Sequence, residues 1–253
     1  MELIKEFDKQ GNWLFKYRGI LPLIILVLGL AVYAYMVWEH SRVSPSSTPY
    51  SSDTYQFLCL AVALFGQVIR ILTVGFTPKN TSGRNTETQV ADTLNTSGIY
   101  SVVRHPLYVG NFFMWLGVAM LTQNTWFIVA FVLMYWMYYE RIMYTEERFI
   151  EGKFGDAFRT WAARTPAIIP YLSQWKNPNL EFSLKKVLRQ EKNGFAAIFL
   201  LFLLFDVTGE YILFGDVAFR NQHWAILGVA SGILYLILKV LKNNTTVLSG
   251  DGR

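Results

Sequence analysis

The chain has 253 residues, of which 53% are hydrophobic and only 16% are charged. A soluble globular domain carries about 25% charged residues, so this composition disfavours an ordinary soluble enzyme and a disordered chain, and it favours an integral membrane protein. The single cysteine, Cys59, excludes an intrachain disulfide. The net charge of +5 is explained more simply by basic loops on the cytoplasmic side of a membrane than by nucleic-acid binding.

Six apolar segments predict an all-α integral membrane protein with about six transmembrane helices. They span residues 19–38, 54–76, 107–121, 125–139, 194–214 and 223–241. The first contains 20 residues, longer than the roughly 7–15 of a signal peptide, so we expect it to be retained. The third and fourth have about 15 residues each, below the roughly 20 that span a bilayer comfortably, and we expect a tight helical hairpin there.

The distribution of Lys and Arg predicts the topology. In chain order, the tails and loops around the six segments contain four, one, three, none, ten, one and two basic residues. This alternation is typical of a multi-pass protein with both termini in the cytoplasm. We divide the chain into an N-terminal part with the first helix and a Ser/Pro-rich loop (1–53), a core (54–172) and a C-terminal extension with two transmembrane helices (173–253).

Two polar segments flank the expected hairpin. LNTSGIYSVVRHPLYVG precedes it, with Arg104, His105 and Tyr108 where the chain enters the membrane and Pro106 suited to the first turn of a helix. ERIMYTEERFIEGKFGDAFRTWAARTPAIIP follows it. Both segments should lie at one membrane face and be neighbours in space. The topology therefore predicts a cytosolic pocket, formed by the loops around the third and fourth helices, where a soluble cofactor meets a lipid-borne substrate.

Together the two segments resemble the isoprenylcysteine carboxyl methyltransferase family, and more broadly the membrane methyltransferases that include phospholipid N-methyltransferases. The family hallmark resembles G-I/V-Y-x-x-x-R-H-P-x-Y-x-G followed by a Glu-Glu helix and FG…P…P. Here these elements read GIYSVVRHPLYVG, EERFIEGKFG and RTPAIIP. The resemblance covers roughly residues 54–172. RHPxYxG alone is only moderately specific, because membrane sterol reductases that use NADPH share it, whereas the full combination is considerably more specific.

The resemblance implies S-adenosylmethionine as the cofactor, with Glu146 in contact with its polar part. Glu147, adjacent on the same helix, is expected to be simply solvated. The family places a substrate-binding arginine about one turn before the glutamate; Arg141 is the nearest match, with Arg104 and Arg164 as alternatives, so Arg141 and Glu146 are the candidate catalytic residues. The residues expected to line the cofactor pocket are Leu94, Asn95, Tyr100, His105, Pro106, Leu107 and Tyr108, less certainly also Asp92 and Thr93.

Methyl transfer from a sulfonium to an anionic oxygen suits these residue types. A carboxylate or phosphate oxygen is already charged at neutral pH, so the enzyme needs alignment of donor and acceptor rather than a strong base. The planar fork of an arginine bonds both oxygens of such an anion. We therefore interpret His105 as a binding residue, and we expect a lipid or lipid-linked partner, no nucleic acid and no metal.

The acceptor and the reaction class have alternatives. The acceptor can be an isoprenylcysteine carboxylate, a lipid phosphate such as that of lipid A, or a phospholipid amine. An NADPH-dependent sterol-type reductase shares the RHPxYxG element. The hypothesis that the protein is a scaffold or transporter is supported only by Asp206 and Glu210. Asp206 is expected near the bilayer middle, where an ionisable group is a functional candidate. Arg70 in the second segment is interpreted as snorkelling to headgroups or contacting a lipid phosphate.

Overall fold

The computed structural model describes residues 2–43, 50–78 and 90–248, and these residues form helices and connecting loops without a strand. An isolated bridge joins Gly98 and Lys176. The helices, in chain order, are α1 (Leu3–Lys16), α2 (Ile20–Val43), α3 (Asp53–Gly75), the 3-10 turn η1 (Ile99–Ser101), α4 (Pro106–Met120), α5 (Thr125–Phe154), α6 (Asp156–Ala162), the turn η2 (Leu172–Gln174), α7 (Leu184–Phe214) and α8 (Gln222–Asn244).

Four of the described helices are long and apolar enough to cross a membrane: α2, α3, α7 and α8. The other two expected spans form the hairpin of α4 and α5. α4 has only 15 residues, and the apolar first half of α5 continues without a break into its charged half, so that α5 reaches 30 residues. The chain is therefore an integral membrane protein with four candidate spans and a short hairpin packed beside them.

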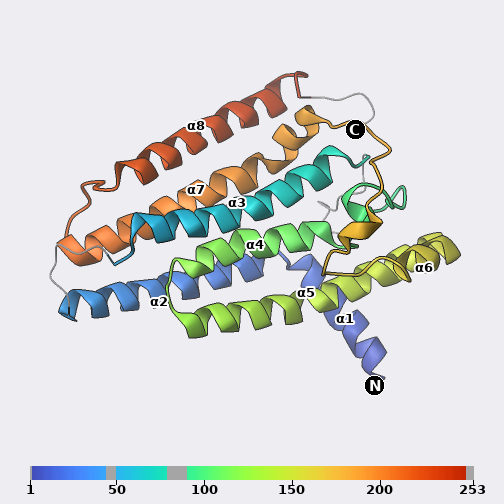
Figure 1. The fold of residues 1–253 in the computed structure, drawn as a ribbon, viewed down its shortest axis with the longest axis horizontal. Helices are drawn as coiled ribbons and strands as arrows, with labels where there is room; N and C mark the ends of the chain where they lie inside the picture. The colour runs from blue at the N-terminus through green and yellow to red at the C-terminus, as the bar shows by residue number, and fades with distance from the viewer. Residues whose placement is uncertain (1, 44–49, 79–89, 249–253) are drawn as a thin grey trace.

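The long helices run side by side in one bundle, with α8, α7, α3 and α4 in succession, while α1 crosses below at a steep angle (Figure 1). α3 and α4 approach so closely because small residues face each other. A Cβ atom at Gly117 would overlap the carbonyl oxygen of Cys59, and one at Gly66 would overlap the carbonyl oxygen of Gly110. This close contact fixes α4 against α3, and the RHP segment leads directly into the start of α4.

Two helical regions were missed by the sequence reading. The N-terminal tail forms α1, which packs on α5 with Gly11 against the Arg141 carbonyl and Thr145. The fifth apolar segment begins at Leu184 rather than at residue 194, because Ser183 caps the helix through the Lys186 N–H and extends it by charged turns. Hydropathy alone does not detect such polar helical turns.

Asp206 and Glu210 lie in α7, eight and four residues before its end at Phe214. Asn221 donates to the Asp206 carboxylate over 2.6 Å. Glu210 accepts backbone N–H groups of residues 218–220 and pairs with the Arg220 guanidinium at 2.6 Å. These carboxylates hold the loop between α7 and α8, so they no longer support a transport role.

Candidate active site

The RHP segment is shaped by a glycine, a 3-10 turn and a proline. Gly98 adopts φ +59°, a left-handed conformation that glycine tolerates without a Cβ penalty. Its carbonyl accepts the Ser101 hydroxyl at 2.6 Å, which closes the turn. Pro106 occupies the first turn of α4, where its missing N–H costs nothing. The side chains of His105 and Tyr108 consequently start from fixed backbone positions.

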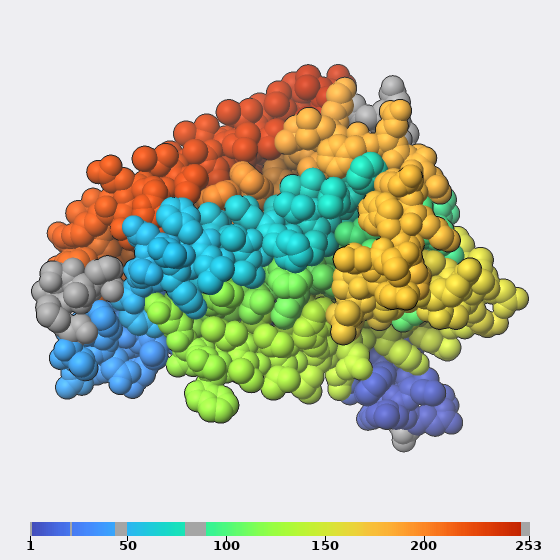
Figure 2. Space-filling model, viewed as in Figure 1, coloured from blue at the N-terminus to red at the C-terminus, as the bar shows by residue number. Residues whose placement is uncertain are grey.

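The connection between α6 and α7 holds this segment from outside through main-chain hydrogen bonds. The Arg104 and His105 N–H groups donate to the carbonyls of Pro166 and Ala167, at 2.9 and 3.2 Å, and the Tyr171 N–H donates to Val102. In the space-filling view the connection spreads over this end of the bundle (Figure 2). The two prolines of the RTPAIIP motif thus flank a strap over the RHP segment.

A cavity of about 430 Å³ lies behind this strap, within the usual 300–1,000 Å³ of small-molecule sites. Its walls come from the α1–α2 junction, α3, residues 90–95, the start of α4, the polar half of α5, α6 and the start of α7. Eight of the residues expected to bind the cofactor line it: Leu94, Asn95, Tyr100, His105, Pro106, Leu107, Tyr108 and Glu146. Thr93 lines it as well, and Asp92 does not belong to its wall.

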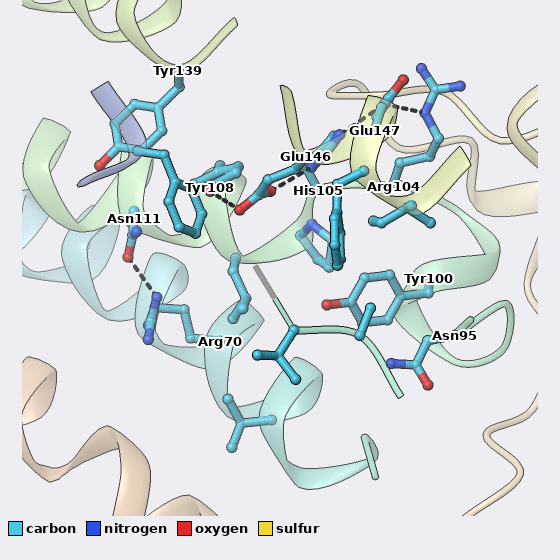
Figure 3. A pocket seen from close by; sticks show the side chains of 18 of the residues that line it. Arg70, Asn95, Tyr100, Arg104, His105, Tyr108, Asn111, Tyr139, Glu146 and Glu147 are labelled. Atoms are coloured by element: carbon cyan, nitrogen blue, oxygen red, sulfur yellow. Dashed lines mark hydrogen bonds and ion pairs between the residues drawn. The ribbon is translucent and has the colours of Figure 1, made fainter. Parts of the chain in front are cut away.

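The two sequence segments meet at a pair of carboxylates (Figure 3). Tyr108 donates its hydroxyl to Glu146 at 2.7 Å, and the His105 Nδ1 atom lies 3.8 Å from the same carboxylate. His105 Nε2 lies 2.8 Å from the Glu147 carboxylate, which also pairs with Arg104 at 2.9 Å. The sequence led us to expect that Glu147 is simply solvated. This expectation is wrong, because Arg104 and His105 both contact its carboxylate.

The two carboxylates differ in their electrostatics. Burial raises the pKa of Glu146, and the charges of His105 and Arg18 and the Tyr108 hydroxyl offset this only in part. Burial also acts on Glu147, but its hydrogen bond and charge interaction with His105, together with the charge of Arg104, lower its pKa. Glu147 thus stays ionised and holds the RHP segment. Glu146 faces the cavity, and its raised pKa means that it is more easily protonated than Glu147.

Arg141 is not brought to the cavity. Its guanidinium donates to Gln10 of α1 at 2.9 Å and to the Met137 carbonyl at 2.8 Å, and it stacks over Phe7. Five residues along an α-helix correspond to a rotation of about 140°, so Arg141 and Glu146 face different sides of α5. Arg141 anchors α1 to α5, and Arg164, the other distant alternative, bonds the Thr160 carbonyl outside the cavity wall.

Other charged residues that the sequence reading did not assign to the site line the cavity. Arg18 comes from the α1–α2 junction, and Arg70 comes from α3. Arg70 is bonded by the Glu191 carboxylate of α7 at 2.7 and 2.8 Å and by Asn111 at 2.7 Å. The sequence carries a signal for Arg70, which is a charged residue within an apolar segment. Arg18 and Glu191 belong to no sequence motif, and only the fold shows that they line the cavity.

Comparison with known proteins places the chain among membrane methyltransferases. Residues 56–157 match the phospholipid methyltransferase family. The cobalt-zinc-cadmium resistance protein CzcN of Cupriavidus metallidurans is 31% identical over 169 residues, 65% of this chain and 69% of the relative. The protein-S-isoprenylcysteine O-methyltransferase of Schizosaccharomyces pombe is 34% identical over 124 residues, and that of Xenopus laevis is 33% identical over 116 residues. No solved structure matches.

The matches to the two isoprenylcysteine methyltransferases cover 49% and 45% of this chain but only 50% and 40% of those proteins. The family match, residues 56–157, contains both the RHP and the Glu-Glu segments. The chain therefore belongs to the isoprenylcysteine carboxyl methyltransferase family of membrane methyltransferases. Its α7 and α8 lie beyond the part matched by the family.

Proposed function

We propose that the protein is an S-adenosylmethionine-dependent O-methyltransferase that methylates a carboxylate or phosphate on a lipid or lipid-linked molecule. The observation that carries this proposal is the convergence of eight expected cofactor residues on one cavity at the polar end of a membrane bundle. The family relation supports methyl transfer, and the membrane helices support a lipid-borne acceptor. We further propose that this end of the bundle and both termini are cytoplasmic.

The cavity suits the proposed cofactor in charge and in shape. Glu146 offers a buried carboxylate to a cationic amino acid end or to ribose hydroxyls. Tyr100, Phe154 and Trp161 give the same cavity aromatic walls, and aromatic faces also attract cations. When bound, S-adenosylmethionine supplies a methyl group on a sulfonium, which leaves as a neutral thioether once the methyl is transferred.

The residues of this chain act by binding and orienting rather than by proton transfer. Tyr108 and His105 hold the Glu146 carboxylate in place, and Glu147 and Arg104 fix His105 in turn. An anionic acceptor oxygen needs no base, so the task of the site is to align the two reactants and to replace water around the anion by fixed dipoles. The arginines of the cavity wall provide the positive charge for that anion.

The proposal is tested by calorimetric binding of S-adenosylmethionine and S-adenosylhomocysteine to the purified protein, with NADPH as the comparison. We expect saturable binding of the first two, followed by transfer of a labelled methyl group into a base-labile ester of a lipid extract. Binding of NADPH alone would favour the reductase. A label found in a base-stable amine would favour phospholipid N-methylation.

Replacement of Arg141 by alanine should leave the dissociation constant of S-adenosylmethionine within about twofold of the wild-type value. The physical reason is that its guanidinium bonds α1 and its own helix instead of facing the cavity. Calorimetry on Arg141→Ala and on Arg104→Ala compares an arginine outside the cavity wall with one inside it. A tenfold loss in Arg141→Ala alone would restore the role inferred from sequence.

Acidification should weaken cofactor binding, and it should do so at a higher pH than if Glu146 had the pKa of an ordinary glutamate. The raised pKa of Glu146 means that its carboxylate takes up a proton above the usual value of about 4.3, and a neutral carboxyl no longer balances a cation. Glu147, with its lowered pKa, stays ionised in this range, and its stabilising contribution is lost only at lower pH. Binding measured against pH should lose this step in Glu146→Gln, and in His105→Gln the step should move to higher pH, because the charge of His105 lowers the pKa of Glu146.

A further inference from the structure

A second cavity of about 310 Å³ lies between α4 and α7. It shares five wall residues with the main cavity: Arg70, Asn111, Trp115, Gln190 and Glu191. The two cavities therefore adjoin at the Arg70 side chain. The second cavity depends on α7, which belongs to the C-terminal extension rather than to the part matched by the family.

The polarity of the second cavity changes along its length. On α4 the wall begins with Asn111 and continues with Met114 and Val118, which share a helix face at spacings of three and four residues. On α7 it begins with Gln190, Glu191 and Asn193 and continues with Gly194 and apolar residues to Leu201. The polar end adjoins the main cavity, and the apolar end extends along the bundle.

Arg70 stands at the border of the two cavities with its orientation fixed. Glu191, only 4% exposed, accepts two of its N–H groups and is itself bonded by Gln67 at 3.2 Å, and Asn111 accepts a third. A guanidinium has five N–H donors, so these three contacts leave two for a ligand. The arrangement suits recognition of an anion by two terminal N–H groups.

We propose that the methyl acceptor binds across this border, with its anionic head at Arg70 and a single apolar chain along the second cavity, and that Glu191 is the positioning residue for Arg70. This inference rests on the proposed function. Three observations favour this occupant: the wall that the two cavities share, the Arg70 N–H donors left beside Glu191 and Asn111, and the apolar wall beyond them. It gives the C-terminal extension a role in selecting the acceptor.

The experiment uses the full chain in phosphatidylcholine nanodiscs, with empty nanodiscs subtracted, titrated with dodecyl phosphate, dodecanoate, dodecanol and inorganic phosphate. Calorimetry should show both dodecyl anions binding at least tenfold more tightly than dodecanol and than inorganic phosphate. Equal affinity for dodecanol would overturn the anion site, and equal affinity for inorganic phosphate would overturn the chain site. The preference between the phosphate and the carboxylate probe identifies the class of head group.

Two variants test the two halves of the site. The double variant Arg70→Gln/Glu191→Gln removes both charges together, so no buried charge is left alone, and it should abolish the preference for the anions over dodecanol. Ala197→Phe fills the apolar wall and should weaken both dodecyl anions at least tenfold, whereas Ala230→Phe, an equally exposed alanine on α8, should not. Wild-type affinities in the double variant or in Ala197→Phe would overturn the corresponding half.

A separate titration with S-adenosylhomocysteine distinguishes this inference from the proposed function. Retained binding of S-adenosylhomocysteine in Ala197→Phe shows that this variant is folded and that its cofactor cavity is intact. Arg70 and Glu191 also line the main cavity, so for their variants an unchanged melting temperature is the control for folding. Failure of the wild-type protein to bind S-adenosylhomocysteine would contradict the proposed function while the dodecyl titrations still report on the acceptor site. Unchanged KM for the lipid acceptor together with a reduced kcat in Glu191→Gln would contradict the positioning role, which predicts a raised KM.

Discussion

Glu146→Gln is expected to reduce methyl transfer by about 10- to 100-fold, because a hydrogen bond to a charged group contributes about 1.5–3 kcal/mol. The glutamine keeps the size of the side chain but gives up the negative charge that faces the cavity. It also offers Tyr108 a weaker acceptor than the carboxylate that now lies 2.7 Å from its hydroxyl. Initial rates of labelled-methyl incorporation, with calorimetric affinity for S-adenosylmethionine, measure the effect.

Glu140→Gln is the matched control for this change. Glu140 lies on the same helix, is exposed and does not line the cavity, so its loss of charge should leave both rate and affinity within about twofold. Equal activity of Glu146→Gln and Glu140→Gln would remove Glu146 from the catalytic machinery. A loss of rate with unchanged cofactor affinity would move its role from cofactor binding to alignment of the acceptor.

The second large effect concerns the packing of α3 against α4. Gly117→Ala should lower the melting temperature by roughly 5–10 °C, since overpacking a close contact costs about 1–3 kcal/mol or more and each kcal/mol shifts a chain of this size by about 2–4 °C. The added methyl group would overlap the Cys59 carbonyl and crowd Ala63. Neither the backbone nor a short side chain can rotate away, so the two helices must separate.

Gly232→Ala provides the control, because a Cβ atom at Gly232 on α8 meets nothing within 4 Å. Both substitutions raise helix propensity by the same amount, so the difference between them isolates the interhelical contact. Thermal unfolding followed by fluorescence-detected size exclusion measures both variants. A Gly117→Ala protein as stable as Gly232→Ala would mean that α3 and α4 do not touch at this glycine.

The parts of the fold that could be predicted are those with a local signal. Residues 54–76 and 223–241 were expected as apolar helices, and α3 and α8 occupy them closely. The meeting of the RHP segment with the Glu-Glu segment followed from the hairpin between them, and the contacts of His105 and Tyr108 with the two glutamates confirm this proximity. The roles of these side chains in catalysis stay a prediction.

The remainder depended on contacts between segments distant in sequence. Arg70 and Glu191 are separated by 121 positions, and no spacing rule links them. The helix α1 and the start of α7 have mixed composition, so a hydropathy criterion passes over them, although α1 leads into the junction that supplies Arg18 and α7 supplies Glu191 to the cavity. The rotation of Arg141 away from Glu146 was computable from the helix period, but the matching of a family pattern along the sequence took no account of it.

The strap over the RHP segment is held by main-chain atoms, and this has a consequence for how the protein tolerates change. The N–H groups of Arg104, His105 and Tyr171 bond to carbonyls, which every residue type carries. Ile169, which is 80% exposed, is therefore free to diversify, whereas Ile168 packs against the hydrophobic core. The length of the strap is fixed as well, because a one-residue deletion would shift all of these pairings together. Between residues 166 and 171 we therefore expect single deletions to reduce activity much more than substitutions of exposed side chains do.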